Sequence, residues 1–231
     1  MQTFVEDLLD LKLMREGIFS LRPVPFDPNE TFELVKDIFD PQVKAKKIGI
    51  KVSIGENLRL PQDMDNYFGT GEERKRDLIQ RLPNPIILPY IPQLYGDGRR
   101  FKQVLINLVK NALKFTHHGQ IDIKACYRPE PENLLVLHVE DTGVGIESAD
   151  LPRLFSQFGK LQRTASINND GIGLGLTIVK MIVEQCGGSV GVESKGANKG
   201  SLFCISMQMN PAESLLHSPQ IPPSYVEEIP Q

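Results

Sequence analysis

The sequence has no excess of charge of one sign: 26 lysine and arginine residues stand against 29 acidic residues, for a formal net charge of −3. Nucleic acid or an anionic membrane as the main partner would require a clustered basic excess, so the balance argues against both. No apolar run approaches the roughly 20 residues that cross a bilayer. The first seven residues are acidic and lack the basic segment of a signal peptide. We therefore expect a cytoplasmic chain without a membrane segment, although a longer parent protein could be anchored in a membrane.

Cysteine is scarce, with three residues in the chain, Cys126, Cys186 and Cys204. Their spacings match no set of metal ligands, and a disulfide framework usually has an even number of cysteines. We expect three reduced thiols in the core. Hydrophobic residues make up 40% of the chain, which is enough to build that core and excludes a chain that is disordered throughout.

Periodicity predicts the secondary structure of most of the chain. Apolar residues at spacings of three and four indicate amphipathic helices, and strict alternation indicates strands. Gly17 and Gly187-Gly188 mark helix ends, and Asp27 or Asn29 is placed to cap the second helix. The expected helices are 2–16, about 30–47, 99–116 and 174–186, and the expected strands are 48–54, 120–127, 134–140, 189–194 and 201–209. Helices mixed with antiparallel strands predict an α+β fold, a two-layer sandwich with helices on one face of a mixed, mostly antiparallel sheet.

Three stretches show no regular pattern. Prolines make residues 22–27 a stiff extended linker. Residues 55–97 mix charges of both signs and contain four prolines from position 83 on that exclude a helix there, so we expect a surface insertion. Residues 210–231 hold five of the 17 prolines and no apolar period, which predicts a disordered tail.

The polar side of the predicted helix 99–116 carries residues suited to nucleotide chemistry. An α-helix turns by about 100° per residue, which places Gln103, Asn107, Lys110, Asn111 and Lys114 opposite the apolar residues. Asparagine costs roughly 0.6 kcal/mol relative to alanine inside a helix, yet it appears twice, one turn apart. Two amides and an ammonium group at i, i+4 and i+7 could hold a hydrated Mg²⁺ and meet a phosphate. An ordinary amphipathic helix with a solvated polar side is the alternative.

A short acidic and glycine-rich run follows the predicted strand 134–140. It reads Asp141-Thr142-Gly143-Val144-Gly145-Ile146. A carboxylate at a strand end can accept a hydrogen bond from the exocyclic amine of adenine, and glycines let the backbone approach the base and turn sharply. A simple hairpin turn is the alternative, because Asp and Gly are the commonest turn residues.

Glycines also open the predicted helix 174–186. The run is Gly171-Ile172-Gly173-Leu174-Gly175-Leu176. Free N–H groups and the positive end of the helix dipole favour an anion there, although the spacing does not match the dinucleotide fingerprint. The polar residues 160–170 before it have the length and composition of a mobile lid over a nucleotide. The alternative is a flexible loop with a glycine-rich hinge.

Taken in order, these segments resemble the N, G1, F and G2 boxes of the histidine-kinase-type ATP-binding domain, whose Bergerat-type fold is shared with gyrase, Hsp90 and MutL. The resemblance covers about residues 23–209. The segments that carry it are 103–116, 141–146, Phe155-Ser156-Gln157-Phe158, 171–176, and a closing hairpin with Gly187-Gly188 and residues 196–203.

The resemblance implies ATP and Mg²⁺ as cofactors and assigns roles to residues. Asn111 would hold Mg²⁺, and Asp141 would bind adenine. Asn107 and Lys114 would line the phosphates, which Gly171, Gly173 and Gly175 would cradle. Further residues expected at the nucleotide site are Gly143, Gly145, Ile146, Phe158, Leu174 and Leu176.

One position separates two chemistries in this superfamily. Hydrolytic members such as Hsp90 and gyrase carry a glutamate four residues before the Mg²⁺ asparagine, where it activates water. This sequence has Asn107 there, and an amide cannot act as a base. The resemblance therefore implies the kinase branch, which transfers the γ-phosphoryl group to a histidine, with positioning and Mg²⁺ supplying most of the catalysis.

No acceptor histidine is visible in this sequence. Residues 1–17 resemble the end of the second helix of a dimerisation hairpin, residues 18–22 would be a linker, and the first helix of the hairpin is absent. The histidines, none of which has the context of an acceptor, are His117, His118, His138 and His217. Three explanations stay open: a fragment of a longer hybrid kinase that could also carry a receiver domain, a kinase acting in trans on a hairpin of another chain, and a regulatory module that binds nucleotide without transferring phosphate. Asn107 disfavours a fourth, a hydrolytic ATPase.

Overall fold

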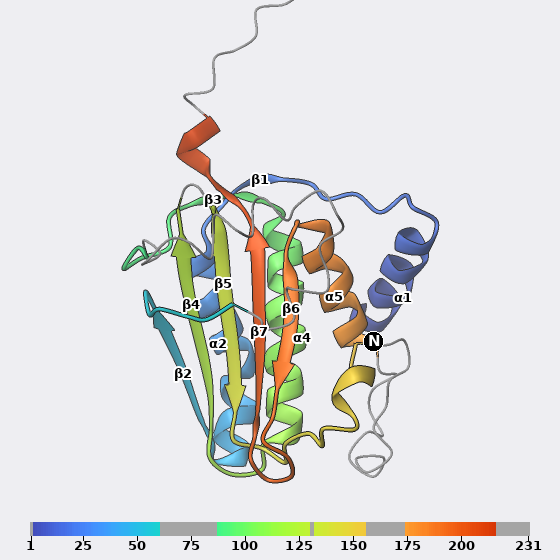
Figure 1. Cartoon of the computed structure of the whole chain (residues 1–231), viewed down its shortest axis with the longest axis vertical. Coiled ribbons are helices and arrows are strands. Elements are labelled where there is room, and N and C mark those ends of the chain that lie inside the picture. Colours follow the sequence, from blue (N-terminus) through green and yellow to red (C-terminus); the bar gives the residue numbers. More distant parts are fainter. Residues whose placement is uncertain (1, 61–86, 130–131, 156–173, 216–231) are drawn as a thin grey trace, which may run out of the picture.

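The computed structural model describes residues 2–60, 87–129, 132–155 and 174–215. Within these ranges one face of a five-stranded sheet is covered by helices, and α1 lies beside α5 (Figure 1). The helices are α1 (Gln2–Arg15), α2 (Pro28–Lys46), α4 (Gly98–Phe115) and α5 (Gly175–Gln185), with short 3₁₀ turns η2 (Leu151–Arg153) and η4 (Ala212–Leu215). The strands are β1 (Val24–Phe26), β2 (Gly49–Ile54), β3 (Leu94–Gly96), β4 (Gln120–Arg128), β5 (Leu134–Asp141), β6 (Ser189–Glu193), β7 (Ser201–Gln208) and β8 (Asn210–Pro211).

The main sheet has the strand order β2-β4-β5-β7-β6. β2 pairs with β4 in parallel, and the other three pairs are antiparallel. The predicted α+β class, with helices on one face of a mixed and mostly antiparallel sheet, is confirmed. The predicted helices and strands that form it also exist, with ends that differ from the expected ones by one or two residues.

The choice of cap for α2 is settled by geometry. Asp27 has extended backbone angles, and its Oδ1 accepts hydrogen bonds from the N–H of Asn29 at 2.8 Å and from the Nδ2 of Asn29 at 2.7 Å. Pro28 occupies the first helical position, where a missing N–H costs nothing. Asp27 is therefore the N-cap.

A second, three-stranded sheet with the order β1-β3-β8 corrects three expectations. Residues 22–27 were expected to be an extended linker, 55–97 to contain a surface insertion and 210–231 to be a disordered tail, yet each contributes one strand of this sheet. Leu94 is fully buried and Ile91 is 3% exposed, so the end of the insertion belongs to the core. Strands of two or three residues show no readable alternation, and these pair with partners far away in the sequence. Residues 61–86 of the expected insertion and residues 216–231 of the expected tail lie outside the described residues.

Helix α4 is central to the core. Its apolar side chains Phe101, Val104, Leu105, Leu108, Val109 and Ala112 are at most 1% exposed. The ring of Phe101 contacts the rings of Phe26 and Phe32, with centroid distances of 5.8 and 5.7 Å. This apolar face was predicted and is confirmed, apart from Phe115, which is only half-buried.

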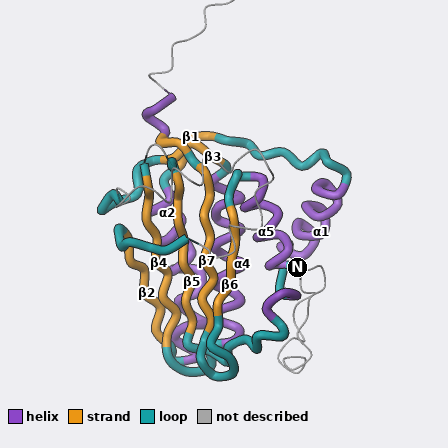
Figure 2. The backbone as a smooth tube through the Cα atoms, viewed as in Figure 1, coloured by secondary structure: helices purple, strands orange, loops and turns teal. Residues whose placement is uncertain are grey.

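The loop after β2 crosses the outer face of the main sheet (Figure 2). Leu58 packs there against Cys126, Leu134 and Val136 in a small second core. The carbonyl of Arg59 lies 2.8 Å from Nε2 of His138. Part of the stretch expected to be an insertion therefore covers the sheet.

The three thiols are free, as expected. Cys126 and Cys204 are buried and Cys186 is half-buried. Burial raises the pKa of Cys186 to about 11 and that of Cys204 to about 12, so neither is a ready thiolate. Of the helices in the described ranges, none is long and apolar enough to cross a membrane.

Candidate functional site

The polar side of α4 meets the first turn of α5 at Asn107. A side chain at Gly175 would place its Cβ 3.3 Å from Oδ1 of Asn107, so glycine lets the two helices approach. Nδ2 of Asn107 is buried and has no hydrogen-bond partner among the described residues. An unpaired buried donor costs about 1–3 kcal/mol, so this amide is suited to a ligand oxygen.

The first turn of α5 offers further donors at the same place. Leu174 stands at the N-cap position without a side-chain hydrogen bond to the helix. The first N–H groups of a helix have no intrahelical partner, and with the helix dipole they favour an anion. Leu174 itself is 3% exposed and anchors this turn in the core, and Leu176 is half-buried. Gly171, Gly173, Phe158 and the expected lid 160–170 lie outside the described residues.

Asn111 and Lys114 follow Asn107 along α4, and both are half-buried. Nζ of Lys114 lies 5.4 Å from the ring centroid of Phe115, which holds the ammonium group over an aromatic face. Within the described ranges no group of three or more His, Cys, Asp or Glu side chains could hold a metal. A divalent cation here would need the amide oxygen of Asn111 together with phosphate oxygens, which is a usual ligand set for Mg²⁺.

Sequence reasoning missed Lys46, which secures the end of α4. This residue of α2 donates from Nζ to the carbonyls of Leu113, at 2.5 Å, and Thr116, at 3.2 Å. The last carbonyls of a helix lack intrahelical partners, so a lysine from a neighbouring helix stabilises them. No local pattern could have pointed to this contact, because about 70 residues separate its partners.

Asp141 is the last residue of β5 and is 5% exposed. Its Oδ1 accepts a hydrogen bond of 2.8 Å from the N–H of Gly143. Burial raises the pKa of Asp141, while hydrogen bonds from Gly143 and from the hydroxyl and N–H of Ser201 oppose that rise. The result is a buried, oriented carboxylate that can accept one more hydrogen bond, the arrangement expected for an adenine amine.

The turn after Asp141 needs its glycines because other backbone comes close. A Cβ at Gly143 would collide with the carbonyl of Phe115 at the end of α4. Gly145 has a φ of 67°, and a Cβ there would collide with the carbonyl of Gly196. The N–H of Val144 donates to Phe115 at 3.1 Å. The turn is therefore wedged between α4 and the hairpin of β6 and β7.

A serine that the sequence did not flag closes this turn. The N–H of Ile146 donates to Oγ of Ser194 at 2.9 Å, and Ser194 donates to the carbonyl of Gly200 at 2.6 Å. Ile146 is 7% exposed and belongs to the core. The predicted motifs thus converge on α4, which contacts α5 through Asn107 and the glycine turn through Phe115.

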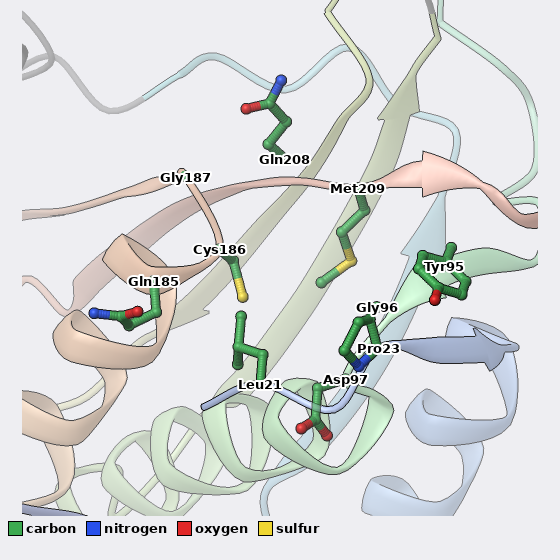
Figure 3. A pocket seen from close by; sticks show the side chains of 10 residues that line it. All are labelled: Leu21, Pro23, Tyr95, Gly96, Asp97, Gln185, Cys186, Gly187, Gln208 and Met209. Carbon is green, nitrogen blue, oxygen red and sulfur yellow. The ribbon is translucent and has the colours of Figure 1, made fainter. Parts of the chain in front are cut away.

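A crevice of about 300 Å³ lies at the other end of these helices (Figure 3). It is bounded by Asp97 at the start of α4 and by Cys186 and Gly187 after the end of α5, with Leu21 and Met209 among its apolar walls. Figure 3 shows Cys186 and Leu21 pointing toward each other across it. None of the predicted nucleotide-site residues lines it, so it is separate from the converging motifs.

Comparison with known proteins agrees with this geometry. Residues 96–211 match the family described as histidine kinase-, DNA gyrase B-, and HSP90-like ATPase. The sensor histidine kinase GacS of Pseudomonas protegens is 42% identical over 207 residues, which are 89% of this chain and 19% of that protein. The autoinducer 2 sensor kinase/phosphatase LuxQ of Vibrio harveyi is 30% identical over 216 residues, 92% of this chain and 21% of that protein. The chain thus spans about a fifth of the length of these relatives.

Solved structures share the fold. Full-length ShkA in complex with AMPPNP matches with a TM-score of 0.64 and 24% identity over 91% of this chain and 36% of that chain. The catalytic domain of histidine kinase ThkA matches with a TM-score of 0.57 and 21% identity over 82% of this chain and 99% of its own. The resemblance inferred from the four boxes is confirmed. The chain is therefore an ATP-binding domain that belongs to the histidine kinase-, DNA gyrase B- and HSP90-like ATPase family.

Proposed function

We propose that the chain binds Mg-ATP and transfers the γ-phosphoryl group to a histidine that is not present in this chain, as the catalytic domain of a sensor histidine kinase in a phosphorelay. The single observation that carries this proposal is Asn107. Its side chain stands between α4 and the start of α5, where a hydrolytic enzyme of the superfamily would place a carboxylate. An amide cannot take a proton from water, but its unpaired Nδ2 can donate to a phosphate oxygen.

The other site residues complete the proposed nucleotide site. Asp141 accepts a hydrogen bond from the adenine amine, and the uncapped first turn of α5 meets the phosphates. Asn111 contributes its amide oxygen to Mg²⁺, and Lys114 places an ammonium group near the phosphates. When bound, Mg²⁺ neutralises charge that develops on the transferring group. The protein then contributes positioning, which is the main requirement of phosphoryl transfer.

The proposed partner is a histidine-bearing dimerisation hairpin. We assign residues 1–17 to the end of the second helix of such a hairpin and residues 23–209 to the catalytic domain. The matched sensor kinases are about five times longer than this chain, which leaves room in them for a hairpin and for a receiver domain. We further propose that this domain works in the cytoplasm, where ATP is available.

The test combines binding and transfer. Calorimetry with a non-hydrolysable ATP analogue, with and without Mg²⁺, measures the site, and radiolabelled ATP with an added histidine-bearing hairpin measures transfer. We expect Mg²⁺-dependent binding and labelling of the hairpin, both lost in Asn111→Ala. Gln42→Ala, which removes an exposed amide on α2, is the matched control.

Two other outcomes would redirect the assignment. Nucleotide binding without transfer to any hairpin would indicate a regulatory module. Rapid hydrolysis without a hairpin, abolished by Asn111→Ala, would indicate a hydrolytic ATPase.

A further inference from the structure

An apolar stripe runs along the exposed side of α2. Its residues recur at spacings of four, three and four, which places them within an arc of about 60° around the helix. They are Leu34, Ile38, Pro41 and Ala45, of which Leu34 and Ile38 are each 44% exposed and the other two are exposed as well. Single exposed apolar residues are ordinary on a protein surface, but four in line over about three turns form a continuous face, which we call the α2 stripe.

Helix α4 lies beside α2 at the same level, behind the sheet (Figure 1). Near the start of both helices the ring of Phe32 contacts the ring of Phe101, and at the other end Nζ of Lys46 reaches carbonyls at the end of α4. The two helices therefore run parallel with matched ends. The half-buried Ile106 lies about 100° around α4 from Asn107, on the side away from α5. The outer surface shared by α2 and α4 is thus separate from the proposed nucleotide side.

The two helices carry opposite charges along this surface. Glu30 and Asp37 lie two turns apart on α2, next to the α2 stripe, and both are exposed. On α4, Lys110 is exposed, and the half-buried Lys102 precedes it by about two turns. Within the described ranges no ion pair engages any of these four side chains. The surface therefore presents an acidic row on α2 beside a basic row on α4.

This charge arrangement is complementary to a second copy of the same chain. A twofold axis parallel to the two helices exchanges their positions, so α2 of each copy faces α4 of the other. The acidic row then meets a basic row twice, and the α2 stripe meets Ile106 of the second copy. A twofold axis running across the helices would instead place acidic rows opposite each other, which is unfavourable.

The size of the face sets the strength of such a contact. Helix α4 has 18 residues, so at about 1.5 Å per residue it is about 27 Å long, and two neighbouring helices are about 20 Å wide. The face covers about 500 Å² on each copy, or about 1,000 Å² for the pair. This is the lower limit for a specific interface, so the contact is expected to be weak and reversible.

We propose that the face formed by the α2 stripe and the outer side of α4 is a docking surface for a second copy of this chain, in a symmetric dimer. Burial of Leu34 and Ile38 on both copies supplies the stabilisation, and the opposite charge rows fix the orientation. This inference goes beyond the proposed kinase function and does not depend on it.

Sedimentation equilibrium of the full chain, without nucleotide and at concentrations up to about 1 mM, measures the association. We expect Ile38→Glu, which places a charge on the α2 stripe, to weaken dimerisation at least about tenfold. Leu9→Glu is the matched control, because Leu9 is an exposed apolar residue of α1, and it should leave the association unchanged. Association that survives Ile38→Glu, or that is lost in Leu9→Glu, overturns the proposal.

Charge reversal tests the orientation of the two copies. Asp37→Lys and Lys110→Glu each bring like charges together and should weaken association several-fold, while the double variant should restore it. Both side chains are exposed, and thermal unfolding of each variant checks that the fold is kept. A wild type that stays monomeric at about 1 mM, or a double variant that associates no better than the single ones, overturns the proposal. Calorimetry with the ATP analogue is a separate measurement, so failure of the dimer and failure of the proposed function are distinguishable.

Discussion

Replacement of Asp141 by asparagine gives the sharpest test of adenine recognition. The carboxylate is held by the N–H of Gly143 at 2.8 Å and by Ser201, so it has a fixed direction. Asparagine keeps an acceptor for Gly143 but presents an amide N–H₂ group next to its carbonyl. The change therefore removes charge and one acceptor position without removing volume.

The expected loss follows from the type of hydrogen bond. A hydrogen bond to a charged acceptor contributes roughly 1.5–3 kcal/mol, which corresponds to about ten- to 100-fold in Kd. Guanine has a carbonyl where adenine has its amine, so the wild-type carboxylate disfavours it and asparagine can donate to it. ATP binding should weaken by this factor, and GTP binding should stay constant or improve.

The same substitution removes a pH-dependent cost to stability. The pKa of Asp141 is raised from its ordinary value of 3.8, so the folded protein holds this proton more tightly than the unfolded chain does. Ionisation above pH 3.8 therefore lowers the free energy of unfolding, and a neutral asparagine removes that cost. Relative to Asp141→Asn, the wild type should therefore lose stability as the pH rises above 3.8.

Calorimetry with ATP and GTP analogues, together with thermal unfolding, measures both effects. Glu140→Gln, an exposed substitution at the neighbouring position, is the control and should change neither. Equal losses for the two nucleotides would refute adenine recognition by Asp141. A difference in melting temperature between the wild type and Asp141→Asn that does not change with pH would refute the reasoning on burial.

Three further predictions concern residues around the site and on the outer face of the sheet. Asn107→Glu supplies a carboxylate beside α5, so hydrolysis of ATP by water should rise and transfer to an added hairpin should fall, as measured by phosphate release and labelling. Lys46→Met removes the donor to the carbonyls at the end of α4 and should lower the free energy of unfolding by roughly 1–3 kcal/mol in urea titrations. Burial lowers the pKa of His138 below its usual 6.5, because desolvation in the folded protein disfavours the charged imidazolium. The free energy of unfolding should therefore fall as the pH drops below 6.5, and His138→Gln should remove that dependence.

The first two of these predictions have matched controls. For Asn107→Glu it is Gln42→Glu, which adds a carboxylate at an exposed position of α2. For Lys46→Met it is Lys44→Met, whose side chain is exposed on the same helix. An equal effect of control and variant would contradict the first two predictions. A pH dependence that survives in His138→Gln would contradict the third, since it would then arise from other groups.

The main sheet and its helices could be predicted because their patterns are long enough to be unambiguous. α4 shows its apolar face over 18 residues, and β4, β5 and β7 are largely apolar runs of eight or nine residues. The small sheet could not be predicted, since β1, β3 and β8 have two or three residues each, and β1 and β8 contain a proline. Their existence depends on pairing between segments that lie far apart in the sequence.

The candidate site, like the fold, was predictable only in part. Asp141, Asn107 and the glycines were recognisable because a nucleotide requires those residue types at fixed local spacing. Lys46, Ser194 and Ser201 were not, because each acts through contacts made by folding. A serine or lysine has no signature of its own until its partner is known.

The sequence by itself determined the fold class and the family, and it predicted the residues of a nucleotide site, since these depend on periodicity and on short motifs. Only the tertiary structure decided which of those residues meet and where α1 lies. Asn107 meets Gly175 because two helices pack, and Asp10 meets Arg100 across 90 residues. Contacts of that kind result from close packing of distant segments, and no local pattern encodes them.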